Sequence, residues 1–140
     1  HNLMPKAIED FGLVLSLKSL FNYIEKTSGI EITFYENLSD YRLNQQTELN
    51  LYRITQEALN NVMKHAAADK IFVQIMLYQT EIIYTFEDNG KGFQIDMVNA
   101  RKKGMGFSSI HNRVLAMSGT LDIDSSLGGG TSITIQIPNG

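Results

Sequence analysis

The amino-acid sequence predicts a two-layer α/β sandwich, in which about three helices cover one face of a mixed β-sheet. Apolar residues recur at helical spacing in three segments, and short runs rich in strand-forming residues lie between them. The strands come mainly in adjacent pairs that single helices separate, which favours a mixed sheet over a doubly wound parallel one. The 140 residues are expected to form one domain, 1–140, without repeats or linkers.

The first expected element is a mostly buried helix. Pro5 fits its first turn, where the missing N–H costs nothing, and Gly29 is placed to end the helix. An alternating run at 30–34 predicts a strand, and 37–43 is expected to be a loop. The apolar positions of the helix are Ile8, Phe11, Leu13, Val14, Leu15, Leu17 and Leu20.

A second, longer helix is predicted from about Gln46 to Ala66. Thr47 and Asn50 are the residues near its start that could cap it. The apolar stripe of this helix consists of Leu51, Ile54, Ala58, Leu59, Val62 and Met63.

The rest of the chain is predicted as two hairpins with one helix between them. Gln79-Thr80 closes the first hairpin, and Gly128-Gly129-Gly130 closes the second. The helix between them is expected from Phe107 to Met117. The strands are expected at 70–78 and 81–87 in the first hairpin, and at 120–125 and 131–137 in the second.

Composition limits the classes of function. The net charge is −3 and there is no cysteine, which excludes disulfide frameworks and thiolate metal sites and fits a reducing compartment. The basic cluster Arg101-Lys102-Lys103 is too small for a nucleic-acid duplex but suits one polyphosphate, so no nucleic-acid partner is expected. No apolar stretch approaches the ~20 residues that span a bilayer. The chain starts at His1 without an initiator methionine, and we expect it to be a fragment of a longer protein.

Four polar residues of the second helix fall on one side of it. Glu57, Asn61, Lys64 and His65 are spaced i, i+4, i+7 and i+8, away from the apolar stripe. A solvated helix face would explain this pattern by itself. The same residues also suit Mg·ATP, because they offer a carboxylate, an amide oxygen for Mg²⁺ and two donors for phosphate. Mg²⁺ in nucleotide sites needs few protein oxygens beside the phosphates.

The segment Asp88-Asn89-Gly90-Lys91-Gly92-Phe93 follows a predicted strand. An Asp-Asn-Gly run alone would ordinarily be a hairpin turn. The second glycine, however, lets the backbone pass close to a flat ligand, and a carboxylate at the strand end can accept the exocyclic amine of adenine.

Gly104-Met105-Gly106 precedes a helix, so its N–H groups could hold an anion, although a flexible turn would look the same. The sequence contains neither a P-loop nor the dinucleotide-binding glycine motif, since position 109 is serine.

Together these segments resemble the boxes of the GHKL superfamily, which includes gyrase, Hsp90, histidine kinases and MutL. The stretch 57–65 resembles its N box, 88–92 the Asp-x-Gly-x-Gly of its G1 box, 104–106 its G2 box, and 128–131 its last glycine-threonine element. The run Gln56-Glu57-Ala58-Leu59-Asn60-Asn61-Val62-Met63-Lys64-His65-Ala66 is similar to that of histidine kinases of the nitrate-sensor and DesK type. The run 106–114 and the junction at 3–13 resemble the same type. This resemblance implies the Bergerat fold.

The resemblance also implies ATP and Mg²⁺ as cofactors and a role for each matched residue. Asp88 is expected to bind the adenine amine, and Thr131 to support Asp88 or the base. Asn61 is expected to ligate Mg²⁺, and Glu57 to be a catalytic residue that orients Mg²⁺-bound water. The remaining ATP-binding residues are expected to be Lys64 and His65, facing the phosphates; Gly90 and Gly92, shaping the adenine wall; and Gly104, Met105 and Gly106, contacting the phosphate chain.

The family's phosphoacceptor motif, His-Asp followed by a glycine and a glutamine, is missing, since His1, His65 and His111 lack that context. The resemblance therefore implies the catalytic part of a two-component sensor kinase, with 1–5 the remnant of a junction to an upstream dimerisation and phosphoacceptor domain. That domain and a response regulator are the expected partners. The full-length protein is expected to be a homodimer, this chain alone monomeric, and its location the cytoplasmic portion of a bacterial sensor that could be membrane-anchored.

Two other functions remain open on the sequence alone. An anti-sigma-type serine kinase shares these boxes, although Lys64-His65-Ala66 and the 3–13 junction favour a histidine kinase. A catalytically inactive nucleotide-binding or docking module is the second alternative, and the intact Glu57, Asn61 and Asp88 argue against it.

Overall fold

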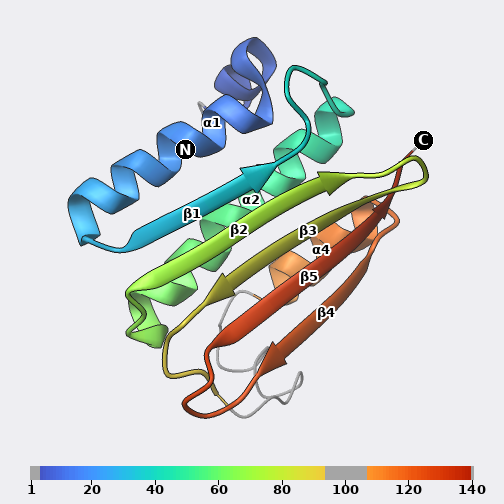
Figure 1. The fold of residues 1–140 in the computed structure, drawn as a ribbon. Helices are drawn as coiled ribbons and strands as arrows, with labels where there is room; N and C mark the ends of the chain where they lie inside the picture. The colour runs from blue at the N-terminus through green and yellow to red at the C-terminus, as the bar shows by residue number, and fades with distance from the viewer. Residues whose placement is uncertain (1–3, 94–106, 140) are drawn as a thin grey trace.

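The computed structural model describes residues 4–93 and 107–139. In this part of the chain five strands form one sheet of order β1-β2-β3-β5-β4. β1 runs parallel to β2 and the other neighbouring pairs are antiparallel, so the sheet is mixed, as the sequence predicts. The strands are β1 (Glu31–Glu36), β2 (Lys70–Leu77), β3 (Glu81–Asp88), β4 (Thr120–Ser125) and β5 (Thr131–Pro138), and the helices are α1 (Met4–Ser28), α2 (Gln45–Asn61) with the π-helical turn η1 (Val62–Ala66), and α4 (Phe107–Ala116) (Figure 1).

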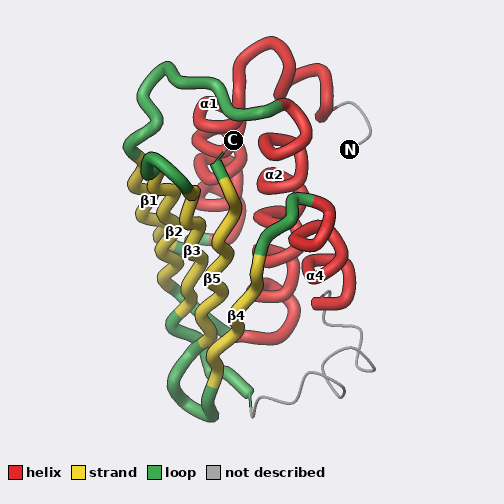
Figure 2. Tube along the Cα trace, turned by 90° about the vertical axis from the view of Figure 1, so that its right-hand side faces the viewer, coloured by secondary structure: helices red, strands yellow, loops and turns green. Residues whose placement is uncertain are grey.

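The helices lie on one face of the sheet, which confirms the predicted two-layer sandwich (Figure 2). Alternation in the strands explains this arrangement, because every second side chain points toward the helices. In β3, Ile82, Tyr84 and Phe86 are buried while the residues between them are partly exposed. Burying an apolar side chain of this size contributes roughly 1.5–3 kcal/mol, so the common core fixes the sheet against the helices.

α1 is not the continuous helix that the sequence predicts. At Gly12 the backbone turns to φ 84° and ψ 172°, a conformation that only glycine adopts readily, and this divides α1 into two helical segments. The guanidinium of Arg42 donates to the backbone carbonyl groups of Ile8 at 3.0 Å and of Glu9 at 3.4 Å. A continuous helix would use these carbonyls for its own hydrogen bonds. Arg42 is held in turn by the buried carboxylate of Glu48 at 2.9 Å.

The kink also corrects the predicted apolar face of α1. Phe11 and Leu15, expected to be buried, are 63% and 57% exposed. The two segments point in different directions, so one helical periodicity cannot describe both. The residues of α1 that do enter the core are Ile8, Leu13, Leu17, Phe21 and Ile24.

α2 begins slightly earlier than predicted. Its N-cap is Asn44, whose Oδ1 accepts from the backbone N–H of Gln46 at 2.8 Å and of Thr47 at 3.4 Å. Thr47 and Asn50 are therefore not the capping residues, and Asn50 lies buried within the helix. Regular α-helix ends at Asn61, and the predicted last turn is π-helical instead.

The other predicted elements are confirmed with small shifts. Gly29 ends α1 at φ 77°, and its N–H donates to the carbonyl of Glu25 at 3.0 Å. The loop between β2 and β3 closes through the N–H of Tyr78, which donates to the carbonyl of Glu81 at 2.8 Å. Of the helices that the structure describes, none is long and apolar enough to cross a bilayer.

Candidate functional site

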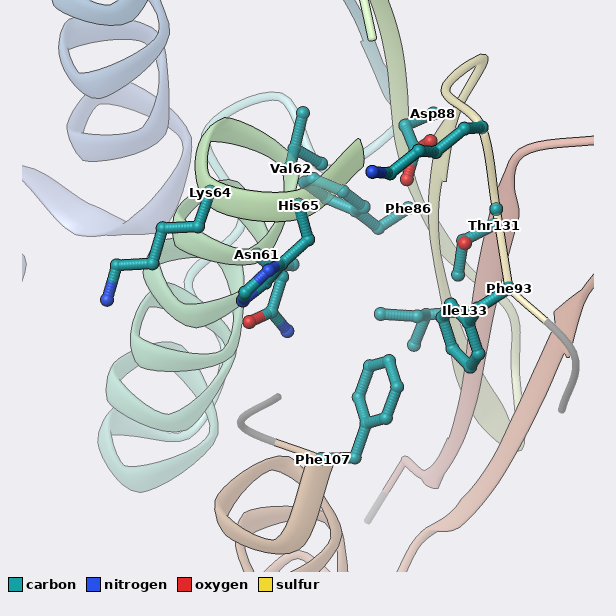
Figure 3. A pocket seen from close by; sticks show the side chains of 13 residues that line it. Asn61, Val62, Lys64, His65, Phe86, Asp88, Phe93, Phe107, Thr131 and Ile133 are labelled. Carbon is teal, nitrogen blue, oxygen red and sulfur yellow. The ribbon is translucent and has the colours of Figure 1, made fainter. Parts of the chain in front are cut away.

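A cavity of about 270 Å³ lies between the C-terminal end of α2 and the adjoining ends of β3 and β5. Figure 3 shows Asp88 and Phe107 at opposite ends of this cavity, with Asn61 on the helix side and Thr131 and Ile133 on the sheet side. Segments far apart in the sequence, from Ala58 to Ile133, thus meet around one space.

The interior of the cavity is mainly apolar. Val62 on the helix side faces Phe86 and Ile133 on the sheet, all of them buried. Phe93 and Phe107 complete the lining, with ring centroids 5.6 Å apart and ring planes inclined by 33°. Apolar and aromatic walls of this kind suit a flat, largely apolar ring, which needs only a few polar groups to orient it.

Asp88 supplies such a group at the end of β3. Its carboxylate accepts a hydrogen bond from the backbone N–H of Gly90 at 2.8 Å and another from the backbone N–H of Thr131, its partner across β3 and β5. Burial raises the pKa of the Asp88 carboxyl above its ordinary value, and the two hydrogen bonds oppose this shift without cancelling it. The Asp88 carboxylate is therefore an oriented hydrogen-bond acceptor, and in the free protein its two hydrogen bonds do not fully offset the cost of its burial.

Glycines hold the loop after Asp88 against the turn between β4 and β5. Gly92 has φ 62°, and a Cβ placed there would collide with the carbonyl oxygen of Ser126. Gly130 has φ 74°, and a Cβ there would collide with the carbonyl oxygen of Asp88. The N–H of Gly128 donates to the carbonyl of Lys91 at 2.6 Å. The glycine turn at 128–130, which the sequence predicts as a hairpin closure and as part of the family's last glycine-threonine element, thus supports the loop that carries the candidate site.

Two further residues that sequence reasoning missed fix this end of the sheet. The hydroxyl of Ser125 accepts from the N–H of Phe93 at 2.9 Å and lies 2.8 Å from the hydroxyl of Thr131. Asn89 accepts through Oδ1 from the N–H groups of Asp69 at 3.0 Å and Lys70 at 2.9 Å, which ties the start of β2 to the end of β3. A serine at a strand end and an asparagine in a turn are too common for the sequence alone to distinguish them.

The helix side brings Asn61, Lys64 and His65 to the cavity. The Nδ2 atom of Asn61 is buried and has no hydrogen-bond partner among the described residues. Lys64 and His65 belong to η1 and are exposed, and Figure 3 shows the Lys64 side chain extended away from the other labelled residues. A π-helical turn changes the phase of the residues that follow it and is often found at functional sites.

Glu57 is not brought together with these three residues. It borders a separate hollow between α1, α2 and α4, where its Oε1 accepts from the hydroxyl of Ser109 at 2.7 Å. The Nε atom of Arg113 lies 3.7 Å from the same oxygen. The helical spacing correctly places Glu57 one turn before Asn61, but the contacts with α4 could not be read from the sequence.

Of the glycines predicted to form the site, the structure describes Gly90 and Gly92. Gly90 is buried and contributes its N–H to Asp88, whereas Gly92 lines the cavity directly. Gly104, Met105 and Gly106, together with the basic run 101–103, lie outside the described residues. Within 4–93 and 107–139, no three His, Cys, Asp or Glu side chains are grouped so that they could hold a metal ion.

Comparison with known proteins agrees with this fold. The chain belongs to the family of histidine kinase-, DNA gyrase B- and HSP90-like ATPases, whose sequence model matches residues 46–140. Within this family it is an ATP-binding catalytic domain of the sensor histidine kinase type.

Two curated relatives illustrate the similarity. The oxygen sensor histidine kinase NreB of Staphylococcus carnosus is 33% identical over 97% of this chain and 39% of that protein. The signal transduction histidine-protein kinase/phosphatase DegS of Bacillus subtilis is 35% identical over 96% of this chain and 36% of that protein. The chain thus spans well under half the length of these relatives.

Solved structures share the fold at lower identity. The catalytic domain of the histidine kinase ThkA has a TM-score of 0.71 at 14% identity and covers 91% of this chain and 90% of that one. The blue-light activated histidine kinase EL346 of Erythrobacter litoralis has a TM-score of 0.70 at 21% identity, over 90% of this chain and 40% of that one.

Proposed function

We propose that this chain binds Mg·ATP in the cavity beside Asp88 and supplies the γ-phosphate to a histidine on a separate dimerisation and phosphoacceptor domain of the same protein. The observation that carries the proposal is the half-buried carboxylate of Asp88 at the wall of a mainly apolar cavity. Because the chain belongs to the ATPase family, we propose ATP as the nucleotide. Because it is similar to a sensor histidine kinase over nearly its whole length, we propose phosphoryl transfer to histidine as the reaction.

The adenine ring fits the chemistry of the cavity. Its exocyclic amine would donate to Asp88, whose orientation is set by Gly90 and Thr131. Its faces would lie against apolar side chains, including Phe93 and Phe107. Guanine carries a carbonyl oxygen where adenine carries this amine, so it would place two acceptors against one another.

The phosphates would leave the cavity toward α2, η1 and the start of α4. The proposed Mg²⁺ ligand is Asn61, and a buried amide with an unpartnered Nδ2 fits a side chain that is completed by a ligand. Held there, Mg²⁺ would supply positive charge to offset the negative charge that develops on the phosphates during transfer. Lys64, His65 and the segment 104–106 are proposed to contact the phosphates, and Glu57 is proposed to orient water on the metal.

The acceptor has to come from elsewhere. Phosphoryl transfer depends on holding the acceptor in line with the γ-phosphate. His65 is exposed on η1 at the cavity itself, and His111 lies on α4 behind Phe107. We therefore assign the acceptor to helices upstream of this chain, which would also form a homodimer, and the next carrier to a response regulator. The transfer to the histidine consumes ATP and the transfer to the response regulator consumes the phosphohistidine, and we place the domain in the cytoplasm, where ATP is supplied.

Titration of this chain with ATP by calorimetry tests the nucleotide site. Asp88→Asn is expected to reduce affinity by roughly ten- to a hundred-fold, because a hydrogen bond to a charged acceptor contributes about 1.5–3 kcal/mol. Asp122→Asn is the matched control, since Asp122 is exposed on β4 and does not line the cavity. Near-native affinity of the Asp88→Asn protein would remove Asp88 from the adenine role.

A further inference from the structure

A polar cluster joins α2 to α4 beside the candidate site. Ser109 donates to Oε1 of Glu57 at 2.7 Å, and Nε of Arg113 lies 3.7 Å from that same oxygen. Nη1 of Arg113 donates to Oδ1 of the buried Asn50 at 3.2 Å. The cluster is the main polar feature of this helix–helix contact, and the function proposed above uses only Glu57.

The helical spacing of the residues in this cluster explains how they meet between α2 and α4. Ser109 and Arg113 are four residues apart on α4 and so face α2 together. Asn50 and Glu57 are seven residues apart, or two turns, on the facing side of α2. Arg113 spans the two turns by contacting both Asn50 and Glu57. Three side chains therefore restrict the position of one carboxylate.

Among the described residues, the Glu57 carboxylate is contacted through one of its two oxygens. Oε2 of Glu57 is buried and has no hydrogen-bond partner among the described residues, and the same holds for Nε of Arg113. An arginine–carboxylate pair that served only to join two helices would be expected to use both oxygens in a bidentate arrangement. Here one buried oxygen of the carboxylate is left without a hydrogen-bond partner among the described residues.

The unpartnered Oε2 belongs to a residue that lies near the proposed path of the phosphates. Glu57 precedes Asn61 by one helical turn, and Nδ2 of Asn61 is also buried without a partner among the described residues. Phe107, two residues before Ser109, lines the end of the cavity opposite Asp88 (Figure 3). The cluster thus adjoins both elements between which the phosphates would leave the cavity.

We propose that Ser109 and Arg113 are positioning residues for Glu57. They hold Oε1 and leave Oε2 to accept a hydrogen bond from water bound to Mg·ATP. A carboxylate fixed before the nucleotide arrives needs no reorganisation during transfer, which is the condition for an effective charged group in a site. This inference rests on the proposed kinase function and adds two residues that support Glu57 in it.

The test is a kinetic comparison with the upstream dimerisation and phosphoacceptor helices supplied to this chain. The variants are Ser109→Ala, Ser109→Thr, Glu57→Gln, the double variant Glu57→Gln with Ser109→Ala, and the control Ser108→Ala. Ser108 neighbours Ser109 on α4 but is exposed and takes no part in the cluster. For each protein, kcat and KM for Mg·ATP are measured together with the melting temperature.

Ser109→Ala is expected to lower kcat by about 10- to 100-fold, because a misplaced group costs rate in this range. KM and the melting temperature should stay near those of the unsubstituted protein, Ser109→Thr should recover most of the rate, and Ser108→Ala should behave as the parent. In the Glu57→Gln background, Ser109→Ala should cause no further loss, because both changes remove the same function.

Unchanged kcat in Ser109→Ala would overturn the inference, as would a loss that adds in full to that of Glu57→Gln. A loss of rate that only follows a lower melting temperature would show a structural tie and would overturn it as well. If the unsubstituted protein transfers no phosphate, the proposed function itself fails and the inference falls with it.

Discussion

Asp88 experiences two opposing influences in the free protein. Burial raises the pKa of its carboxyl above the ordinary value of 3.8, and the N–H groups of Gly90 and Thr131 lower it by a smaller amount. Because the pKa of the folded protein is raised, the contribution of Asp88 to stability is fully present below pH 3.8 and is lost as the pH rises through the raised pKa. At neutral pH the ionised side chain therefore costs stability, which is consistent with a residue kept for binding.

The raised pKa of Asp88 leads to a prediction for the stability of Asp88→Asn. The asparagine retains an oxygen that can accept from Gly90 but carries no charge to bury, so the variant should be at least as stable as the parent at pH 7. The difference in unfolding free energy should shrink as the pH falls and vanish near pH 3.8, the ordinary pKa of the group. Urea unfolding at several pH values measures it. A variant that is less stable at pH 7 and equal at low pH would contradict the assignment of a raised pKa.

Asn61 allows a second prediction at the scale of one residue. Because its Nδ2 has no partner among the described residues, Asn61→Ala removes no hydrogen bond to them through that atom and should leave the fold intact. Affinity for Mg·ATP should fall about ten-fold, equivalent to ~1.4 kcal/mol, with a smaller change for ATP in the presence of a chelator. Asn60→Ala is the control, since Asn60 is exposed on the same turn and does not line the cavity. Equal losses with and without Mg²⁺ would indicate a structural role.

At the scale of elements, the kink in α1 is the feature with the clearest energetic consequence. Gly12→Ala forces a side chain into φ 84°, and the new Cβ would approach Nε of Arg42 to 2.9 Å, disturbing the pair with Glu48. Gly29 has a similar φ of 77°, but a Cβ added there would meet nothing within 4 Å, so Gly29→Ala isolates the backbone strain.

We therefore expect Gly12→Ala to lose more stability than Gly29→Ala. Backbone strain of this kind costs roughly 1–3 kcal/mol, and only Gly12→Ala adds the displacement of Arg42. Chemical denaturation of both variants gives the comparison. Equal losses would mean that Arg42 moves away at no cost and does not hold the kink.

A comparison of the predicted and observed elements shows which features of the fold could be predicted from the sequence alone. Helices and strands are predicted correctly because apolar periodicity reports which side of each element faces the core. The break at Gly12 was missed because one glycine within a helical pattern is usually tolerated. Arg42, which donates to a carbonyl at the break, lies 30 residues away along the chain. The cap at Asn44 was missed because Thr47 and Asn50 are equally good capping residues by type.

At the scale of the whole molecule, the fold assembles the candidate site from segments that are separate in sequence. Asp88 comes from β3, Asn61 from the end of α2, Phe107 from the start of α4 and Thr131 from β5. Asp88, Asn61 and Thr131 could be proposed from the sequence because each lies in a short motif typical of the family, whereas Phe107 was expected only as the start of a helix. The support from Ser125 and Asn89, and the contacts of Glu57 with α4, depend on tertiary packing and have no such motif.

Incubation with γ-labelled ATP tests most directly whether this chain acts as the ATP-binding catalytic domain of a histidine kinase. The chain alone should acquire no acid-labile label, because His65 is proposed to bind the phosphates and His111 lies on α4 outside the cavity lining. Addition of the upstream dimerisation and phosphoacceptor helices, fused or in trans, should give an acid-labile label on those helices. Asp88→Asn should strongly reduce this label at ATP concentrations below the dissociation constant of the variant. Strong labelling of the isolated chain on an internal histidine, or no labelling once the helices are supplied, would contradict the account.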